Sequence, residues 1–358
     1  MASTRNRTIV GLDIEPSHLA AAEAIVNGRV AVQRAAVASL APGLVRDGEV
    51  VDVEGLSAAL KDFFAAHNLG RRVRLGVANQ RIVVRTIELP PIADPRELDA
   101  AVRFQAQDNI PMPLDEAVLD YQPLGLVETP QGDRLRVVLV AARRDMIDRL
   151  VSAARGAGLR PEGIDLSAFA MIRALSPGAT PATDADGAAA GGTLYVNVGG
   201  MTNLAIAAGS ACSFTRVAMI GLDTMVAELA ERRGLTLEHA EQWLVHVGLE
   251  APADTIEGDP EIVADARSVL TSGADRIVDE VRNSLDFYAG QGASVMVQRA
   301  VITGSAVSIP GFVAQLATGV SIPVESGKVA EAQPGALHGL DPARVTVAAG
   351  LSVSEGPA

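Results

Sequence analysis

The 358-residue sequence has a single cysteine, few aromatic residues and no long apolar segment. With only Cys212 present, no internal disulfide can form, which is typical of proteins from a reducing compartment. The five histidines have no cysteine partner at metal-ligand spacing, so we expect no zinc site. No apolar run reaches about 18 residues, and Asp13 and Glu15 interrupt the first one too early for a signal peptide. We therefore expect a cytoplasmic protein without a membrane-spanning segment.

Positive charge is also scarce, with 30 Lys and Arg against 43 Asp and Glu and a formal net charge of −13. Nucleic acid and anionic bilayers would on average be repelled, which disfavours both as direct partners. The mean hydropathy is nevertheless +0.24, mainly because alanine and valine are abundant. This combination is typical of a buried sheet covered by alanine-rich helices.

One strand-and-loop pattern occurs twice. Residues 7–15 form a β-branched run with Asp13 near its end, and residues 193–200 repeat that shape with Asn197 in the matching place and glycines beyond it. Residues 176–192 between them are small and polar, without apolar periodicity, which predicts a linker. We expect a first half over residues 1–175 and a second half over residues 193–358.

The first half contains an expected α+β insert over about residues 84–160. Asp94 is placed to cap a helix whose first position is Pro95, and that helix should end near residue 109. A strand over 134–142 and a helix over 145–157 follow, the latter with one apolar stripe.

The second half combines a helical subdomain, over about residues 223–295, with returning strands. Apolar residues recur at helical spacing in three segments, which predicts helices over 223–233, 237–247 and 260–289. Strands are expected at 300–303 and 345–348. Alternating strands and helices in both halves favour an α/β architecture.

Common enzyme motifs are absent: there is no Walker A loop, no G-x-S-x-G and no complete G-x-G-x-x-G. Three strand ends instead lead into small-residue loops, at Gly11–Ser17, Val198–Thr202 and Ile302–Gly311. Their order and spacing resemble the two phosphate loops and the adenosine loop of the actin-like ATPase superfamily. The resemblance implies a duplicated, bilobed actin-like (RNase H-like) fold with an inserted α+β subdomain.

Within that superfamily the sequence most resembles the PilM family of type IV pilus assembly proteins, which is related to FtsA. The matching segments include GLDI, RTIELP, QDNIPMPLDE and RNSLDFY, at Gly11–Ile14, Arg85–Pro90, Gln107–Glu116 and Arg282–Tyr288. The resemblance extends over about residues 8–353.

The resemblance implies a site for ATP and Mg²⁺ formed by the loops of both halves. Its expected residues are Asp13, Ser17, Asn197, Gly199, Gly200, Thr202, Glu280, Gly304 and Ser305. This sequence departs from the family pattern at each subsite: Glu15 replaces a glycine, Ala20 replaces a lysine, Asn197 replaces an acid, and Ser305 and Ala306 replace glycines. These changes predict a degenerate nucleotide site without catalytic residues. Asp13 as a simple amide cap and Glu280 as a solvated helix residue stay open as alternatives.

The resemblance also implies a scaffold on the cytoplasmic face of the inner membrane that binds the N-terminal peptide of a PilN-type membrane protein. The peptide should lie between the first-half core and the insert, beside Val83, Arg85, Ile87, Phe104, Ile110 and Met112. Core packing of Phe104 and Met112 is the alternative. Other pilus inner-membrane proteins and further copies of the chain also stay open as partners.

Two other functions compete with this interpretation. An active actin-fold ATPase needs an acidic second loop, which Asn197 does not supply. An FtsA-like division protein needs an amphipathic membrane helix, whereas residues 351–358 are short and have no cation.

Overall fold

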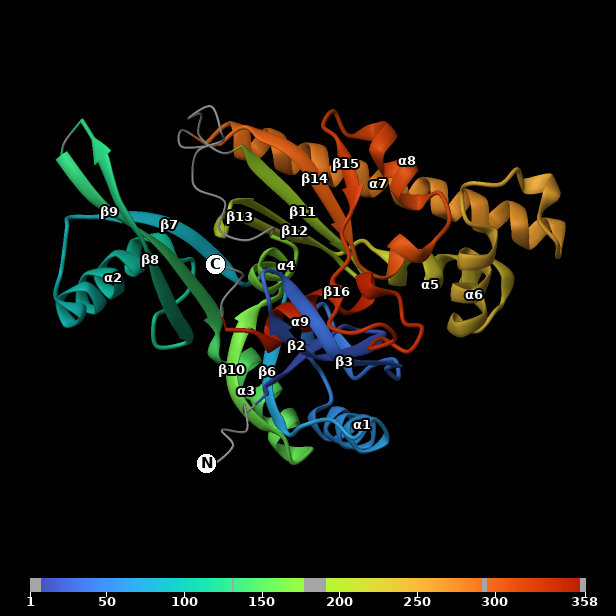
Figure 1. The fold of residues 1–358 in the computed structure, drawn as a ribbon, viewed down its shortest axis with the longest axis horizontal. Coiled ribbons are helices and arrows are strands. Elements are labelled where there is room, and N and C mark those ends of the chain that lie inside the picture. Colours follow the sequence, from blue (N-terminus) through green and yellow to red (C-terminus); the bar gives the residue numbers. More distant parts are fainter. Residues whose placement is uncertain (1–7, 131, 177–190, 292–294, 355–358) are drawn as a thin grey trace.

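The computed structural model describes residues 8–130, 132–176, 191–291 and 295–354. Two sheets of the same topology dominate it (Figure 1). In each sheet, three strands consecutive in the chain pair antiparallel with one another. Two later strands then extend the sheet in parallel from the other edge of the first of these three. The first sheet has the order β10-β6-β1-β2-β3-β16 and the second β13-β12-β11-β14-β15. The predicted duplication is therefore confirmed.

The strands of the first sheet are β1 (Val10–Ile14), β2 (His18–Val26), β3 (Val30–Ser39), β6 (Arg72–Val77), β10 (Arg160–Leu166) and β16 (Ala330–Glu331). Those of the second are β11 (Gly192–Val198), β12 (Thr202–Ala208), β13 (Ala211–Ala218), β14 (Val297–Thr303) and β15 (Val324–Ser326). A small hairpin, β4 (Val45–Arg46) and β5 (Glu49–Val50), precedes the first helix.

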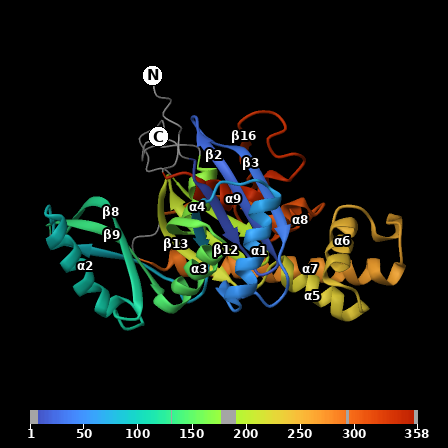
Figure 2. The same cartoon turned by 90° about the horizontal axis from the view of Figure 1, so that it is seen from below.

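Helices cover both sheets in layers (Figures 1 and 2). Helices α1 (Val53–Ala66) and α3 (Arg144–Gly156) pack on one face of the first sheet. Helices α4 (Ser167–Leu175) and α9 (Thr346–Ser352) lie between the two sheets. Helices α5 (Leu222–Arg233), α6 (Leu237–Val247), α7 (Pro260–Ala289) and α8 (Phe312–Gly319) cover the outer face of the second.

The central layer is closely packed because two glycines let backbones meet. A Cβ atom on Gly11 would lie 1.9 Å from the carbonyl oxygen of Ala348, and one on Gly350 would lie 1.9 Å from that of Ala170. Any larger residue at either position would push α9 away from β1 or from α4.

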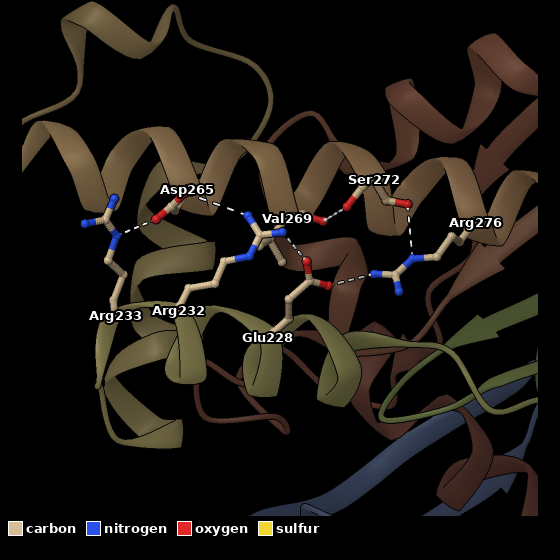
Figure 3. A network of polar contacts seen from close by, with 7 residues as sticks. All are labelled: Glu228, Arg232, Arg233, Asp265, Val269, Ser272 and Arg276. Atoms are coloured by element: carbon tan, nitrogen blue, oxygen red, sulfur yellow. Dashed lines mark hydrogen bonds and ion pairs between the residues drawn. The ribbon is translucent and has the colours of Figure 1, made fainter.

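An ion-pair network joins α5 to α7 on the surface of the second sheet's helical layer (Figure 3). Glu228 accepts from Arg276 at 3.0 Å and from Arg232 at 2.5 Å, and Arg233 pairs with Asp265. Partly exposed pairs of this kind stabilise modestly, so the apolar core beneath them supplies most of the cohesion.

Local sequence signals located several helices well. Helices α6 and α7 have the predicted bounds, and Thr236 and Asp259 cap them through backbone N–H groups of the first turn. Helix α5 begins one residue earlier than expected, at Leu222. The helix expected after Asp94 is α2 (Pro95–Asn109), with the Asp94 carboxylate accepting from Arg96 and Glu97.

The insert is smaller than expected. It consists of a three-stranded sheet, β7 (Val83–Leu89), β9 (Gly132–Arg143) and β8 (Ala117–Thr129), with α2 packed on one face. Helix α3, which we expected inside the insert, instead packs in the core of the first sheet, and strand β10, which begins where we expected the insert to end, pairs with β6 of that sheet. An apolar stripe shows that a helix is covered, but it does not reveal which sheet covers it.

The C-terminal part of the chain returns to the first sheet. Residues 345–348, expected as a strand, form the end of a 3-10 turn (Pro342–Val345) and the start of α9. Val329, Leu337, Ala348 and Val353 are buried with residues of β2 and β3. The expectation that residues 193–358 form only the second half is therefore wrong beyond about residue 328. Of the expected linker 176–192, residues 177–190 lie outside the described residues.

The two sheets and their helices define two lobes. We call residues 8–176 together with 329–354 the first lobe, and residues 191–291 and 295–327 the second lobe.

Candidate functional site

The turn between β1 and β2 carries the first candidate residues. Asp13 lies near the end of β1, and the chain turns at Glu15, whose backbone N–H donates to the carbonyl of His18 at 2.9 Å. The Asp13 carboxylate accepts from Ser167 Oγ at 3.4 Å, at the start of α4. Asp13 and Glu15 are each only 8% exposed, so two carboxyl groups are buried within one turn.

The second lobe places a glycine loop against this turn. After Asn197 at the end of β11, the chain passes through Gly199 and Gly200 before β12 begins. One oxygen of the Glu15 carboxylate accepts the backbone N–H of Gly200, and the other lies 3.5 Å from Asn197 Nδ2. A Cβ atom on Gly199 would lie 2.4 Å from both carboxylate oxygens. Glu15 therefore sits directly against the loop expected to bind phosphate.

A second contact joins the lobes beside the first. Ser17 Oγ donates to Asp223 Oδ1 at 2.5 Å, and Asp223 lies in the first turn of α5. The imidazole of His18 lies beside these residues, with Nε2 3.7 Å from Glu15 Oε2 and Nδ1 3.3 Å from Ser17 Oγ.

Burial controls the electrostatics of this cluster. Burial, reinforced by the neighbouring Glu15, raises the pKa of Asp13 to about 7. Burial also raises the pKa of Glu15 to about 7, although the Gly200 N–H opposes the change. The pKa of His18 is lowered, again mainly by burial. Near neutral pH the cluster can therefore hold protons that exposed carboxyl groups would have released.

The remaining nucleotide-site candidates have protein partners. Thr202 Oγ1 donates to the carbonyl of Ile220 at 2.7 Å, and Glu280 pairs with Arg216 at 2.7 Å. Gly304 has a φ of 99°, and a Cβ atom there would lie 2.5 Å from Asn197 Oδ1. Ser305 is the exception, because it is buried and its Oγ has no hydrogen-bond partner among the described residues.

The residues present do not fit a nucleotide phosphate in this conformation. The cavity beside Asp13, Glu15 and Asn197 has a volume of about 20 Å³, which holds one water molecule at most. Ala20, at the position where the family has a lysine, is buried in an alanine-rich cluster at 1% exposure. The Glu15 carboxylate already accepts the N–H that a phosphate oxygen would need. In the described part of the chain, no group of three or more His, Cys, Asp or Glu side chains is placed to hold a metal ion.

The candidate partner-peptide residues lie in the insert, and most of them form its core. Val83, Ile87 and Ile110 are buried beneath α2, and Met112 packs against them. Phe104 is 65% exposed on the outer face of α2, and Arg85 is exposed on β7. The six residues therefore do not line one open groove.

A larger cleft lies close to them, where the insert meets both lobes. It has a volume of about 280 Å³, and its walls come from residues 77–80, 82, 84, 166, 168, 203 and 215–217. Asn203 is 4% exposed, and its Oδ1 has no hydrogen-bond partner among the described residues. Across the cleft, Gln80 Nε2 donates to the carbonyl of Val217 at 3.1 Å.

Comparison with known proteins resolves the family. The type IV pilus assembly protein PilM family matches residues 11–332. The chain belongs to the PilM family.

Solved structures support the same fold. A PilM-PilN type IV pilus biogenesis complex matches with 24% identity over 96% of this chain and 97% of that one, at a TM-score of 0.76. The ethanolamine utilization protein EutJ from Carboxydothermus hydrogenoformans matches with 14% identity over 98% and 91% of the two chains, at a TM-score of 0.53. The predicted actin-like fold is confirmed. Among the described residues of this PilM-family chain, no helix combines the length and apolar character needed to cross a membrane.

Sequence reasoning missed two features of this PilM-family chain. The cleft depends on Asn203 and Thr215, whose strands give no sign that they face the insert. The position of Glu15 was visible as a departure from the family pattern, but its acceptor role was not, because Gly200 is 185 residues away.

Proposed function

We propose that this PilM-family protein is a scaffold of type IV pilus assembly that binds the N-terminal cytoplasmic peptide of a PilN-type inner-membrane protein. It acts at the inner face of the membrane through that partner and does not depend on nucleotide turnover. The match to a PilM-PilN complex supports the choice of partner.

The observation that carries the proposal is the cleft of about 280 Å³ between the insert and the two lobes. Its size is near the lower end of ligand sites, which suits a few residues of an extended segment. Strands β7 and β13, which approach each other there, are the outermost strands of their sheets. Each therefore has one edge of backbone N–H and C=O groups that no strand of the described residues pairs. An extended peptide can bind such an edge by strand addition.

The lining of the cleft combines the two features that peptide binding needs. Val77, Val84 and Val217 offer apolar contact, while Asn203 Oδ1 offers a buried acceptor with no protein donor among the described residues. A peptide N–H that reached this oxygen would satisfy a group whose burial is otherwise unfavourable. The Glu15 carboxylate on the glycine loop disfavours an enzyme, because it occupies the N–H that a nucleotide phosphate would need.

A binding titration tests the proposal. The probe is a fluorescent synthetic peptide with the N-terminal sequence of the PilN-type partner from the same genome, followed by fluorescence anisotropy. Val84→Arg places a charged side chain in the cleft, and we expect binding at least tenfold weaker. The control is Val127→Arg, the same change at a half-buried position on β8.

Unchanged binding by Val84→Arg, or equal losses in both variants, would count against the cleft. Backbone pairing has its own test, because N-methylation of alternate peptide residues removes donors from one edge only. Strand addition predicts that one set of methylated positions abolishes binding and the other does not.

A further inference from the structure

One short turn of the first lobe makes two side-chain contacts with the second lobe at the glycine loop, beside the separate contact of Thr303 Oγ1 with Thr346 Oγ1 at 2.8 Å. Glu15 reaches Gly200 and Asn197, and two residues later Ser17 reaches Asp223. The partners lie at two neighbouring points of the second lobe, the end of β11 and the first turn of α5. A Cβ atom on Gly200 would lie 2.5 Å from Asp223, so these two points are themselves in contact.

The geometry at the loop is that of an anion and its binding site. The backbone N–H of Gly200 points at a carboxylate oxygen, and the adjacent Gly199 has no side chain to hold that carboxylate away. Burial raises the pKa of Glu15 to about 7, so above pH 7 its carboxylate is an anion, and charge-assisted hydrogen bonds from backbone N–H groups to oxyanions are stronger than neutral ones. Successive backbone N–H groups in a tight turn commonly form concave sites that bind anions. Here the acceptor belongs to the same chain.

The fit leaves no room for a competing ligand. The remaining cavity of about 20 Å³ is too small for a phosphate group, and the Glu15 side chain is 8% exposed. The hydroxyl of Ser17, 2.5 Å from Asp223, closes the neighbouring approach.

We propose that Glu15 is an intramolecular ligand of the Gly199–Gly200 loop, and that this contact together with Ser17–Asp223 holds the two lobes closed without any bound nucleotide. The carboxylate takes the structural place that an external anion would take, so the closed arrangement is the resting state of the protein. The inference concerns lobe closure and stands independently of the partner peptide.

The distance between the two lobes, measured in the 358-residue protein, tests the proposed closure directly. Lys61 on α1 and Gln242 on α6 are exposed, one on each lobe, and are replaced by cysteine for spin labels. The native Cys212 is buried, and burial raises the pKa of its thiol to about 12, which keeps it unreactive. Pulsed electron spectroscopy gives the distance distribution, and hydrogen exchange reports the backbone of residues 197–204.

Glu15→Ala removes the acceptor and should lengthen or broaden the distance distribution. At pH 8, where Glu15 is ionised, the same change should accelerate exchange in residues 197–204 about tenfold or more, the loss expected for one hydrogen bond to a charged group. Glu15→Gln keeps an oxygen acceptor of the same length, so it should stay closer to the wild type. Glu23→Ala is the matched control, because Glu23 Oε1 also faces a glycine N–H, that of Gly70 at 3.4 Å, but within the first lobe.

Opening by Glu15→Ala, with partial rescue by Glu15→Gln and no effect of Glu23→Ala, supports the proposal. An Ala variant with the wild-type distances and exchange rates overturns it, as does a Gln variant that opens as far as the Ala variant. Ser17→Ala tests the second contact of the proposal. It should open the lobes less than Glu15→Ala does. In the double variant the two effects should add.

Discussion

We predict that Mg-ATP binds this protein at least a hundredfold more weakly than it binds a relative with complete phosphate and adenosine loops. The perturbation that tests the cause is Glu15→Gly, which restores the residue of the family pattern. A phosphate oxygen at the Gly200 N–H has two ways to coexist with Glu15: the carboxylate stays beside it, or the carboxylate leaves.

These two arrangements have different free-energy costs, and the one with the smaller cost determines how ATP binds. Two negative charges about 4 Å apart repel by roughly 4 kcal/mol at an effective dielectric constant near 20. Displacing Glu15 instead sacrifices one hydrogen bond to a charged group, which costs about 1.5–3 kcal/mol. Displacement is therefore preferred, and at about 1.4 kcal/mol per factor of ten it weakens ATP by roughly 10- to 150-fold. The absence of a cation at Ala20 and of an acid at Asn197 weakens it further.

At pH 8, where Glu15 is ionised, isothermal titration calorimetry with Mg-ATP should detect no binding by the wild type at micromolar concentrations. Glu15→Gly should gain about one to two powers of ten in affinity, and the Glu15→Gly, Asn197→Asp double variant should gain more. Glu23→Gly, on β2 but outside the interface between the lobes, controls for the loss of one carboxylate. Micromolar binding by the wild type that Glu15→Gly abolishes would refute the reasoning, because Glu15 would then help to bind Mg²⁺.

The fold supports three further predictions. Val83 and Ala141 are direct cross-strand partners, so replacing residues 83–141 with a short Gly-Ser linker should leave a folded protein by circular dichroism that no longer binds the PilN-type peptide; retained affinity would move the site elsewhere. Arg74 donates to the carbonyl of Val353 at 2.7 Å, so Arg74→Ala should lower the free energy of unfolding in urea by about 2 kcal/mol, whereas Arg85→Ala, on an exposed strand position, should change it little. The pKa of Asp13, raised by burial to about 7, makes the folded state bind a proton that the unfolded state releases near pH 4, so this contribution to stability is lost as pH rises from about 4 to 7. Asp13→Asn removes that loss, and its stability relative to the wild type should rise by on the order of 3 kcal/mol between pH 4.5 and 8; a pH-independent difference would contradict it.

Local signals predicted much of this fold, because helix caps and apolar periodicity depend only on residues that are close together in the sequence. Asp94 and Pro95 begin α2 as expected, and the repeated strand pattern around Asp13 and Asn197 correctly predicted two similar sheets. The failures concern partners distant in sequence. The stripe on α3 predicted a covered helix but assigned it to the wrong sheet.

For the candidate site too, features that depend on neighbouring residues could be predicted, whereas contacts between residues distant in sequence could not. The departure at Glu15 was visible in the sequence, and it predicted interference with phosphate. Its contact with Gly200 could not be predicted, because it depends on how two lobes come together rather than on any local pattern. The run of small and β-branched residues at 345–348 suits a strand or a buried helix equally, and only the close approach at Gly350 shows why it is helical.

The return of the C-terminal segment has a consequence for how the protein is made. Val329, Leu337 and Ala348 complete a core whose other members, such as Ala20 and Val32, are synthesised about 300 residues earlier. The first lobe therefore cannot bury its inner face until residues 329–353 have been synthesised. During translation that face of β2 and β3 stays exposed, so we expect the nascent chain to engage chaperones for longer than a two-domain protein of equal length whose N-terminal domain folds alone.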